Sequence, residues 1–294
     1  MNVLLSGASG LIGPALRSAL TGAGHTVRSL VRREPTGPHE DRWDPSAGLM
    51  DPGVLDGVDV VVCLSGAGVG DHRWTASYKR TIVSSRVDSV GTIVRTMRSA
   101  GSTAKLVSAS AVGYYGDTGD ARVDEHTPSG DSFLADVCVQ WEGAARPLQD
   151  AGNVVSFTRT GLVLARHGGL LQRLAPIVKA GLGGRLGSGR QYMPWISLTD
   201  EVAALRFLVE NDLPGPVNLT GPAPVRNDEF TRALGEVLHR PTVLFVPGFA
   251  ARLALGEFAG DVLTGQQAVP AALEAAGFSF EHRDVRSALR SELG

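Results

Sequence analysis

Three glycines near the start of the chain, Gly7, Gly10 and Gly13, have a spacing that suggests a ligand-binding turn. They follow one another at intervals of three in the stretch MNVLLSGASGLIG. Glycine lacks a Cβ and adopts positive φ at little cost, so this spacing suits a tight turn that a bulky group can approach closely. We expect that group to be the pyrophosphate of a dinucleotide.

The residues around these glycines predict a strand, a turn and a helix. Residues 3–5 form a short apolar run typical of a buried parallel strand. One helical stripe then follows, made of Ile12, Ala15, Leu16, Ala19 and Leu20. The start of such a helix presents free N–H groups and a positive dipole to phosphate oxygens. The alternative is a helix that packs closely on a strand and binds no ligand.

Two arginines at the end of the second expected strand indicate which dinucleotide binds. An acidic residue about 20 residues beyond the glycines usually holds a free ribose 2′-hydroxyl, whereas a 2′-phosphate calls for arginine. This chain has Arg32 and Arg33 there, in SLVRRE. A guanidinium can grip a phosphate with two hydrogen bonds and stack on adenine. NADP is therefore favoured over NAD, although the arginines could merely solvate the strand end and Glu34 could meet a hydroxyl.

Strands and helices alternate along most of the chain. Further strands are expected in HTVRSLVRR, VDVVVCLSGAG, KLVSASAVGYYG, VVSFTRTGLVL and PVNLTG. Such alternation implies βαβ crossovers and a parallel, doubly wound sheet, which binds ligands outside the carboxyl ends of its strands. The predicted class is α/β, a doubly wound parallel Rossmann sheet with a small α+β C-terminal substrate lobe.

The expected domain division falls near residue 220. Residues 1–220 are predicted to form the NADP-binding domain and residues 221–294 the small C-terminal lobe, because the regular alternation stops there. Residues 168–195 are expected to contribute to the substrate side. They include the glycine-rich stretch GLGGRLGSGRQ, which could be a substrate-side loop or a flexible surface connection.

The composition favours a globular enzyme or binding protein that acts on a small molecule. The 294 residues carry a formal net charge of −2, which gives no electrostatic reason to bind nucleic acid or an anionic membrane. We expect a cytoplasmic location, since the sequence shows no apolar leader and no apolar stretch of roughly 18 residues. Cys63 and Cys138 fit reduced, buried thiols, and the scattered histidines give no reason to expect a metal.

Several stretches together resemble a known family. SGASGLIG is similar to the glycine motif of the extended short-chain dehydrogenase/reductase superfamily, the NAD(P)-dependent epimerases and dehydratases. Others resemble one subgroup of it, the uncharacterised epimerase-family proteins with a C-terminal domain of unknown function: LSGAGVGDHRWT, SASAVGYYGD, FLADVCVQWE, RTGLVLARHGG, GLGGRLGSGRQYMPWISLTDEV, NDEFTRALGEVLHRP and LTGQQAVPAALEAAGFSF. The resemblance spans nearly the whole chain and implies the Rossmann fold, while the reaction of that subgroup is itself poorly defined.

The resemblance also implies cofactor contacts at Gly7, Ser9, Gly10, Leu11, Ile12, Val31, Arg32, Leu64, Ser65 and Arg86. The residues themselves support most of these. Ser65 and Gly66 follow a buried strand, where the nicotinamide half of a dinucleotide would cross the sheet. Arg86 could reach a phosphate or could lie on a solvated helix face.

The usual catalytic dyad of the superfamily has no counterpart in this chain. The resemblance implies a tyrosine as general acid/base, with a lysine four residues later that lowers the pKa of the phenol. None of the four tyrosines is followed by a lysine at that spacing. When Glu142 is aligned with the superfamily's helix glutamate, Leu134 stands at the tyrosine position and Cys138 at the lysine position. A leucine cannot move a proton.

The candidate catalytic residues are therefore Ser110, Tyr114 and Tyr115. Ser110 resembles the superfamily's hydrogen-bonding serine and could orient a substrate carbonyl or hydroxyl, or it could satisfy backbone groups at the strand end. Either tyrosine could act as the acid, although an unperturbed phenol titrates at about 10. Residues 124–126, two acids and a histidine, are expected first to form a solvated loop and second to contact a substrate.

Amphipathic side chains elsewhere could line a substrate pocket, and the candidates are Trp74, Gln191, Tyr192 and Trp195. Trp195 could equally belong to an interdomain core, because Pro194 and Ile196 flank it.

Two kinds of function remain open from the sequence. One is an NADP-dependent oxidoreductase or epimerase acting on an unidentified small polar substrate, which could be nucleotide-linked, with Ser110 and a tyrosine in place of the usual dyad. The other is an NADP-binding protein that does not turn over and serves as a sensor or scaffold.

Overall fold

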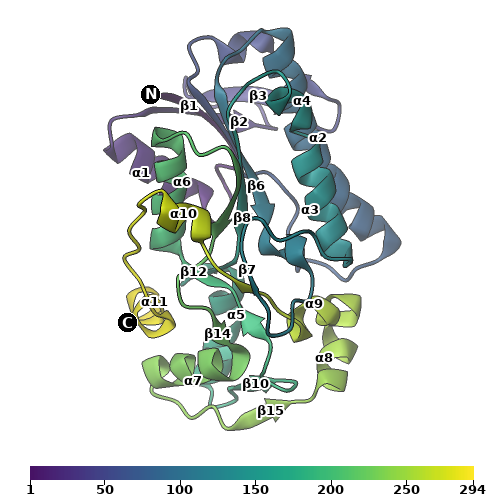
Figure 1. Cartoon of the computed structure of the whole chain (residues 1–294), viewed down its shortest axis with the longest axis vertical. Coiled ribbons are helices and arrows are strands. Elements are labelled where there is room, and N and C mark those ends of the chain that lie inside the picture. Colours follow the sequence, from purple (N-terminus) through teal and green to yellow (C-terminus); the bar gives the residue numbers. More distant parts are fainter.

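A parallel sheet forms the centre of the molecule (Figure 1). The structure is a computed structural model that describes residues 1–294, apart from the side chain of residue 254. Across the eight-stranded sheet the order is β13, β8, β6, β5, β1, β2, β3, β4, and neighbours are parallel except β3 and β4. The strands are β1 (Asn2–Ser6), β2 (Thr26–Val31), β3 (Glu40–Asp44), β4 (Leu49–Met50), β5 (Val60–Cys63), β6 (Lys105–Ala111), β8 (Val155–Thr160) and β13 (Gly215–Leu219).

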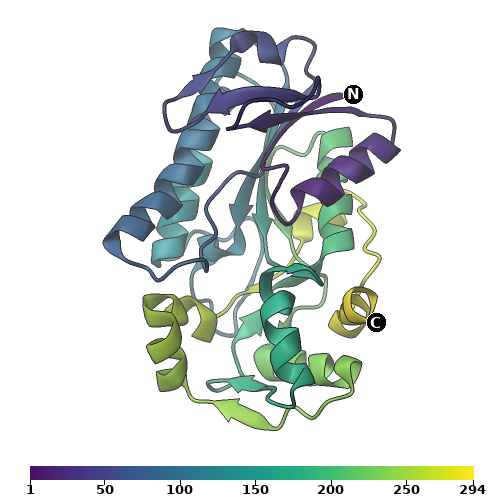
Figure 2. The same cartoon turned by 180° about the vertical axis from the view of Figure 1, so that it is seen from behind.

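Helices cover both faces of this sheet (Figures 1 and 2). One face carries α1 (Gly13–Gly22) and α6 (Leu198–Glu210), and the other carries α2 (Ala76–Ser99), α3 (Phe133–Gly143) and α4 (Arg146–Gln149). Strands β1 to β4 extend the sheet in one direction and the later strands extend it in the other. The predicted doubly wound Rossmann sheet is confirmed, and the crevice between β1 and β5 is where such sheets bind ligands.

The central strands are apolar along their length because both of their faces are covered. All four side chains of β5 and both leucines of β1 are fully buried. Leu16 and Leu20 of α1, part of the stripe predicted from the sequence, pack against this core. Burial of this apolar surface stabilises the sheet and holds the loops after β1, β2 and β5 at one edge.

A smaller layer of structure lies beyond the carboxyl ends of the strands (Figure 1). It contains α5 (Gly169–Lys179) and α7 (Asn227–Leu238) around a core that includes Trp195 and Phe230. Its short strand pairs are β9 (Leu162–Ala165) with β12 (Trp195–Ser197), β10 (Gly184–Leu186) with β15 (Leu244–Val246), and β11 (Tyr192–Met193) with β14 (Val225–Arg226). The layer continues with α8 (Gly248–Leu255), the 3₁₀ turn Gly256–Phe258 and α9 (Ala259–Leu263).

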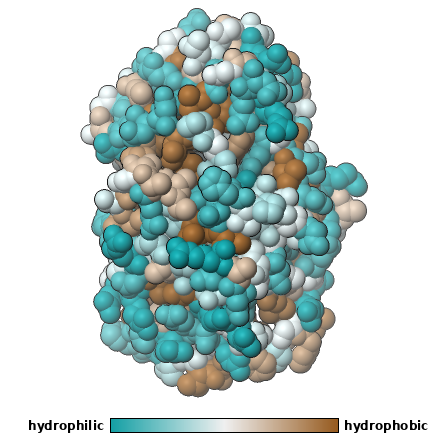
Figure 3. All heavy atoms as spheres, viewed as in Figure 1, coloured by the Kyte–Doolittle hydropathy of each residue, from teal (hydrophilic) through white to brown (hydrophobic). Residues whose placement is uncertain are grey.

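This layer exposes more large apolar side chains than the rest of the surface. Phe249 and Leu253 of α8 are 73% and 79% exposed, and Val243 beside β15 is 84% exposed. Figure 3 shows apolar atoms at the lower end of one face, where this layer lies. Even so, no helix within the described residues has both the length and the apolar character needed to cross a membrane.

The end of the chain packs on both layers. β16 (Gln267–Ala268) pairs with β7 (Arg122–Val123), α10 (Ala271–Ala275) packs on β13, and α11 (Val285–Leu293) packs on α7. Asp200, in the first turn of α6, holds the segment between α10 and α11 in place. It accepts hydrogen bonds from the amides of Glu281 and His282 at 2.8 and 3.1 Å. The C-terminal residues therefore contact the sheet as well as the smaller layer, and the domain division at residue 220 remains a prediction.

Candidate dinucleotide and active site

The three glycines have different surroundings in the structure. Gly7 has a φ of +78°, and a Cβ there would lie 2.7 Å from the carbonyl carbon of Leu64. A Cβ on Gly13 would lie 2.7 Å from the carbonyl carbon of Ala8, so α1 packs directly on the turn. A Cβ on Gly10 would lie 3.4 Å from the carbonyl oxygen of Gly7, which is an ordinary van der Waals contact. Gly7 and Gly13 thus allow the protein to pack closely, and Gly10 leaves room for a ligand.

The start of α1 offers hydrogen-bond donors beside Gly10. Ser9 and Leu11 are exposed, and α1 begins at Gly13. Within the described part of the chain, the backbone amides of Leu11 and Ile12 donate to no protein acceptor. The helix dipole adds to their attraction for phosphate oxygens. An open glycine and unpartnered donors at a helix start fit a dinucleotide diphosphate.

At the end of β2, the two arginines are not equivalent. Arg33 forms a two-pronged ion pair with Glu40 of β3, at 2.8 and 2.5 Å. Hydrogen bonds from Arg33 and Thr36 lower the pKa of the Glu40 carboxyl to about 2. Glu34, which could have met a ribose hydroxyl, pairs instead with Arg42. Arg32 is exposed, and its guanidinium pairs with no carboxylate among the described residues.

At the end of β5, Arg86 of α2 lies against the backbone of Gly66. A Cβ on Gly66 would lie 3.3 Å from the Arg86 side chain. The Arg86 guanidinium stacks over the Trp141 ring, 4.8 Å from its centroid, and donates to the carbonyl oxygen of Ile82 at 2.9 Å. Burial lowers the pKa of Arg86. Arg86 is therefore half-buried between α2 and α3 rather than on a solvated helix face, and it adjoins the half-buried Leu64 and Ser65 at this strand end.

A buried hydrogen-bond network occupies the ends of β6 and β8. Ser110 of β6 donates to Oε1 of Glu142 at 2.7 Å. Arg159 of β8 holds the same carboxylate with two hydrogen bonds of 2.9 Å, one to each oxygen. Ser110 and Arg159 are 4% and 3% exposed. The carboxylate and guanidinium satisfy each other, which makes this buried ion pair tolerable.

Tyr115 belongs to the same network. Its hydroxyl donates to Oδ1 of Asn218 at 2.7 Å and accepts from Arg159 at 3.1 Å. Burial raises the pKa of the Tyr115 phenol to about 12. Tyr115 is 3% exposed, so its hydroxyl stabilises the packing of β8 and β13 and is poorly placed to exchange protons with a ligand.

Tyr114 differs from its neighbour, because it is half-buried and its ring faces the Arg159 guanidinium at 3.4 Å. Within the described chain its hydroxyl makes no hydrogen bond like those of Ser110 and Tyr115. The expectation of a solvated loop at residues 124–126 was wrong for Glu125, which is 7% exposed. Its carboxylate accepts from the amides of Asn218 and Ala272, since the C-terminal segment packs over it.

The positions aligned with the superfamily's dyad carry no proton donor suited to catalysis. Leu134 packs in an apolar cluster with Trp74, Phe133 and Phe258. The Cys138 thiol donates to the carbonyl oxygen of Ala111 at 3.5 Å, and burial raises its pKa to about 11. A thiol with so high a pKa stays protonated and unreactive at neutral pH.

The structure does not gather the four candidate substrate residues around one site. Trp195 is 1% exposed and donates to the carbonyl oxygen of Ala223 at 2.9 Å, which places it in the core of the smaller layer. Trp74 is 9% exposed and packs edge-on against Phe133. Gln191 donates to the carbonyl oxygen of Leu186, and the Tyr192 ring stacks under the guanidinium of Arg226. Both side chains are half-buried and already have protein contacts.

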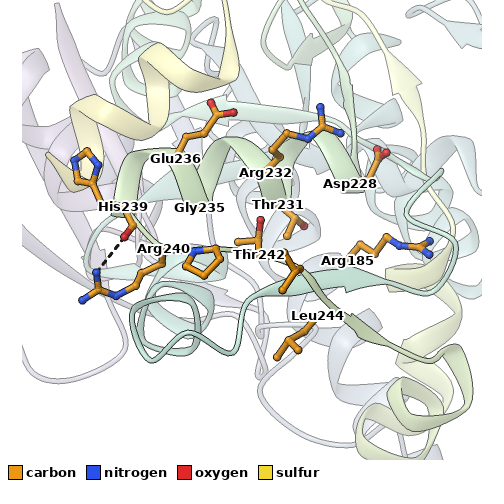
Figure 4. Close-up of a pocket in the computed structure, with 12 residues that line it drawn as sticks. Arg185, Asp228, Thr231, Arg232, Gly235, Glu236, His239, Arg240, Thr242 and Leu244 are labelled. Carbon is orange, nitrogen blue, oxygen red and sulfur yellow. Dashed lines mark hydrogen bonds between the residues drawn. The ribbon is translucent and has the colours of Figure 1, made fainter.

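A cavity in the smaller layer lies away from the strand ends. It measures about 690 Å³ between α7 and residues 240–244, and the close-up in Figure 4 shows Thr231 and Thr242 near its centre. The guanidinium groups of Arg185, Arg232 and Arg240 point in different directions there, so they do not converge on one anion. This cavity therefore gives no anion-binding site comparable to the glycine turn at the edge of the sheet.

The sequence analysis did not find the ion pair between Arg159 and Glu142, which holds together the ends of β6 and β8, the region called the reaction end below. Arg159 is a lone charge in the otherwise apolar or hydroxylic strand VVSFTRT, and Glu142 is a charge on a helix that packs against that strand. A buried charge requires a partner, so the arginine in this strand was the available signal. Asn218 and Glu125 carried no comparable signal, because their partners lie far away in the chain.

Together the doubly wound sheet, the glycine turn and the open edge define a Rossmann-fold dinucleotide-binding protein. The family model for the NAD dependent epimerase/dehydratase family matches residues 3–135, and a domain of unknown function, DUF1731, matches residues 246–292. The chain is 50% identical over 289 residues to epimerase family protein Mb2239 of Mycobacterium bovis, covering 98% of this chain and 96% of that protein. It belongs to the NAD-dependent epimerase/dehydratase family, in the group of epimerase family proteins that carry this C-terminal domain.

Solved structures agree with this assignment. Human epimerase family protein SDR39U1 (isoform 2), solved with NADPH, matches with a TM-score of 0.91 at 29% identity, covering 100% of this chain and 99% of that one. A nucleoside-diphosphate sugar epimerase from Corynebacterium glutamicum matches with a TM-score of 0.82 at 36% identity. The match covers 100% of this chain and 58% of that longer one. This protein is thus of the NAD(P)-dependent epimerase type.

Proposed function

We propose that the protein binds NADP(H) and acts as an oxidoreductase or epimerase on a small polar substrate, which could be nucleotide-linked. The observation that carries the cofactor choice is the pairing pattern after β2. Arg33 and Glu34 are held in ion pairs, while Arg32 is exposed and pairs with no described carboxylate. A cation without a partner at this place suits a 2′-phosphate.

The proposed contacts run along the carboxyl edge of the sheet in strand order. Arg32 after β2 would hold the 2′-phosphate, with Val31 beside it at the strand end. The open face of Gly10 and the amides at the start of α1 would receive the diphosphate. Leu64, Ser65 and Arg86 at the end of β5 would meet the nicotinamide half, which supplies hydride transfer when bound. Human SDR39U1, solved with NADPH, supports this cofactor.

For catalysis, the geometry supports Ser110 and Tyr114 over Tyr115. Ser110 stands at the end of β6 and would orient a ligand group, and Tyr114 would be the proton carrier because its hydroxyl is not committed to Asn218 as that of Tyr115 is. The Corynebacterium protein, described as a nucleoside-diphosphate sugar epimerase, supports a nucleotide-linked substrate. Gln191 and Tyr192 remain candidate substrate contacts on the smaller layer.

A second function, a sensor or scaffold that binds NADP without turnover, is favoured by the reaction end itself. Leu134 is packed among aromatic rings, and the hydroxyls of Ser110 and Tyr115 are bonded within the protein. The two functions separate when the NADPH-loaded protein is offered carbonyl compounds and nucleotide sugars and its absorbance is followed. Oxidation that Tyr114→Phe reduces supports the enzyme, and tight NADPH binding without any oxidation supports the sensor.

The cofactor choice is tested first and separately. Calorimetric titration with NADP(H) and NAD(H) should show tighter binding of NADP(H). Equal affinities would contradict the role given to Arg32, and no binding of either would contradict the whole proposal.

A further inference from the structure

One end of the molecule combines exposed apolar side chains with basic side chains. Residues 176–190 and 239–256 meet there through the pairing of β10 with β15, and α8 follows β15 directly along the chain. Figures 1 and 2 show β10, β15 and α8 at the end opposite β2 and β3. These two segments are called the apolar tip.

The apolar side chains of this tip protrude from it. Leu244 and Phe245 are neighbours on β15, so they point to opposite sides of the strand, and both are exposed. On α8, Phe249 and Leu253 lie four residues apart on one face of the helix, and both are largely exposed. The tip is therefore a ridge of apolar side chains and not a flat face that one protein partner would cover.

The apolar tip is basic, although the chain as a whole has a formal net charge of −2. Its two segments contain no aspartate or glutamate. They carry five basic residues, all exposed, which are Lys179, Arg185, Arg190, Arg240 and Arg252. The charge of the whole chain thus conceals a local excess of positive charge beside the exposed apolar side chains.

These basic side chains are largely free of acidic partners. Arg190 lies 3.9 Å from Asp120, and the other four form no ion pair with any described residue. The guanidinium of Arg185 donates to the carbonyl oxygen of Ser188 at 2.6 Å, which leaves its charge unneutralised. The carboxylates that flank the second segment, Glu236 and Glu257, are paired with basic residues outside the tip. The tip therefore attracts an anionic surface.

We propose that the apolar tip docks the protein on an anionic membrane surface. The apolar side chains insert at the level of the headgroups, and the basic side chains meet the lipid phosphates. Aromatic and leucine side chains among arginines are typical of segments that lie in the membrane interface, and such a contact needs no membrane-spanning helix. A second copy of the chain fits this surface less well, because two tips in contact would bring like charges together.

Sedimentation of the intact protein with vesicles tests the proposal. Vesicles of phosphatidylcholine alone are compared with vesicles that also contain about 30% phosphatidylglycerol, at about 0.1 M salt. The anionic vesicles should bind the protein at least about tenfold more tightly, and most of that binding should be lost at about 0.5 M salt. Absence of binding to the anionic vesicles, or equal binding to both kinds, would overturn the proposal.

A first pair of variants tests the apolar part of the contact. Phe249→Ser with Leu253→Ser should weaken binding to the anionic vesicles by at least about tenfold, because two side chains no longer insert. Leu49→Ser with Val139→Ser is the matched control, since both residues are exposed apolar side chains outside the tip. Circular dichroism checks that each variant is folded. Native binding by the Phe249 and Leu253 variant would show that the tip is not the contact.

A second pair tests the charges. Arg185→Gln with Arg252→Gln should weaken binding to the anionic vesicles on the order of tenfold. Arg98→Gln with Arg146→Gln removes the same charge from exposed arginines of α2 and α4 and should have little effect. Equal losses in the two pairs would assign the attraction to the whole chain and overturn the proposal.

Analytical ultracentrifugation tests the other occupant. The native protein and the Phe249→Ser, Leu253→Ser variant should sediment as the same species in the absence of lipid. A native dimer that this variant converts to a monomer would assign the tip to a second copy of the chain and would overturn the proposal.

Discussion

The carboxyl edge of the sheet has two parts that satisfy their polar groups in different ways. After β1 and β2, the amides of Leu11 and Ile12 and the guanidinium of Arg32 have no protein acceptor or carboxylate within the described chain. After β6 and β8, Ser110 and Arg159 are bonded to one another through Glu142. The first part is arranged to receive a ligand and the second to hold its own shape. The polar groups that are open to a cofactor and those that hold the ends of β6 and β8 together therefore lie in separate parts of this edge.

The largest effect on the part that would bind the cofactor should come from filling the open space at Gly10, in the glycine turn after β1. Gly10→Val should abolish NADP binding while the protein stays folded, because a branched side chain would occupy the space that the diphosphate needs. Calorimetry measures binding and circular dichroism measures folding. Gly22→Ala, where a Cβ meets no described atom, is the control and should bind normally. Normal NADP binding by Gly10→Val would mean that the phosphate turn lies elsewhere.

A substitution in the network at the ends of β6 and β8 should lower the stability of the protein and leave its affinity for the cofactor unchanged. Arg159→Met leaves the Glu142 carboxylate buried without its partner, so the free energy of unfolding should fall by about 3 to 5 kcal/mol. Arg286→Met, which breaks the exposed pair with Glu236, should cost no more than about 1 kcal/mol. Denaturant unfolding measures both. If the two variants lose similar stability, the network does not hold the reaction end together.

A third prediction uses Glu201, a fully buried side chain of α6 that accepts from Thr160 at the end of β8. Burial raises the pKa of Glu201 to about 8, so the folded state favours its protonated form. The stability it contributes is complete below the unfolded pKa of about 4.3 and is lost as the pH rises through about 8.

Glu201→Gln should remove this loss. Between pH 5 and pH 8 the native protein should lose on the order of 3 kcal/mol relative to the variant, measured by denaturant unfolding across that range. Parallel pH profiles for the two proteins would show that Glu201 ionises without cost. Such a result would indicate that water reaches the Glu201 carboxylate beside the end of β8, although the side chain is buried in the structure.

The smallest expected effect distinguishes the two arginines. Arg32→Ala should weaken NADP⁺ binding by about 1.5 to 3 kcal/mol, the value of a hydrogen bond to a charged group, and leave NAD⁺ binding nearly unchanged. Arg33→Ala should weaken NADP⁺ less, because Arg33 is held by Glu40. Titration of both cofactors checks this order. A larger effect of Arg33→Ala would transfer the 2′-phosphate contact to that residue.

The sequence was a good guide wherever the answer depended on neighbours in the chain. The strand, glycine turn and helix of residues 2–22 were predicted and found, because the apolar run and the helical stripe reflect burial on a parallel sheet. It could not assign different surroundings to the three glycines, since those depend on Leu64 and Ala8 coming close to the turn. The residues alone could not separate Arg32 from Arg33 for a similar reason, because β3 must first pair with β2 to bring Glu40 alongside Arg33.

The sequence by itself determined the sheet class, the position of the glycine turn, and the presence of Leu134 and Cys138 at the positions aligned with the dyad. Tertiary structure alone decided that Ser110 donates to Glu142, that Tyr115 is bonded to Asn218, and that Trp195 lies in a core. The physical reason is distance along the chain. Periodic burial marks each element from within, whereas a buried charge or hydroxyl is satisfied by a partner that only the packing of separate elements supplies.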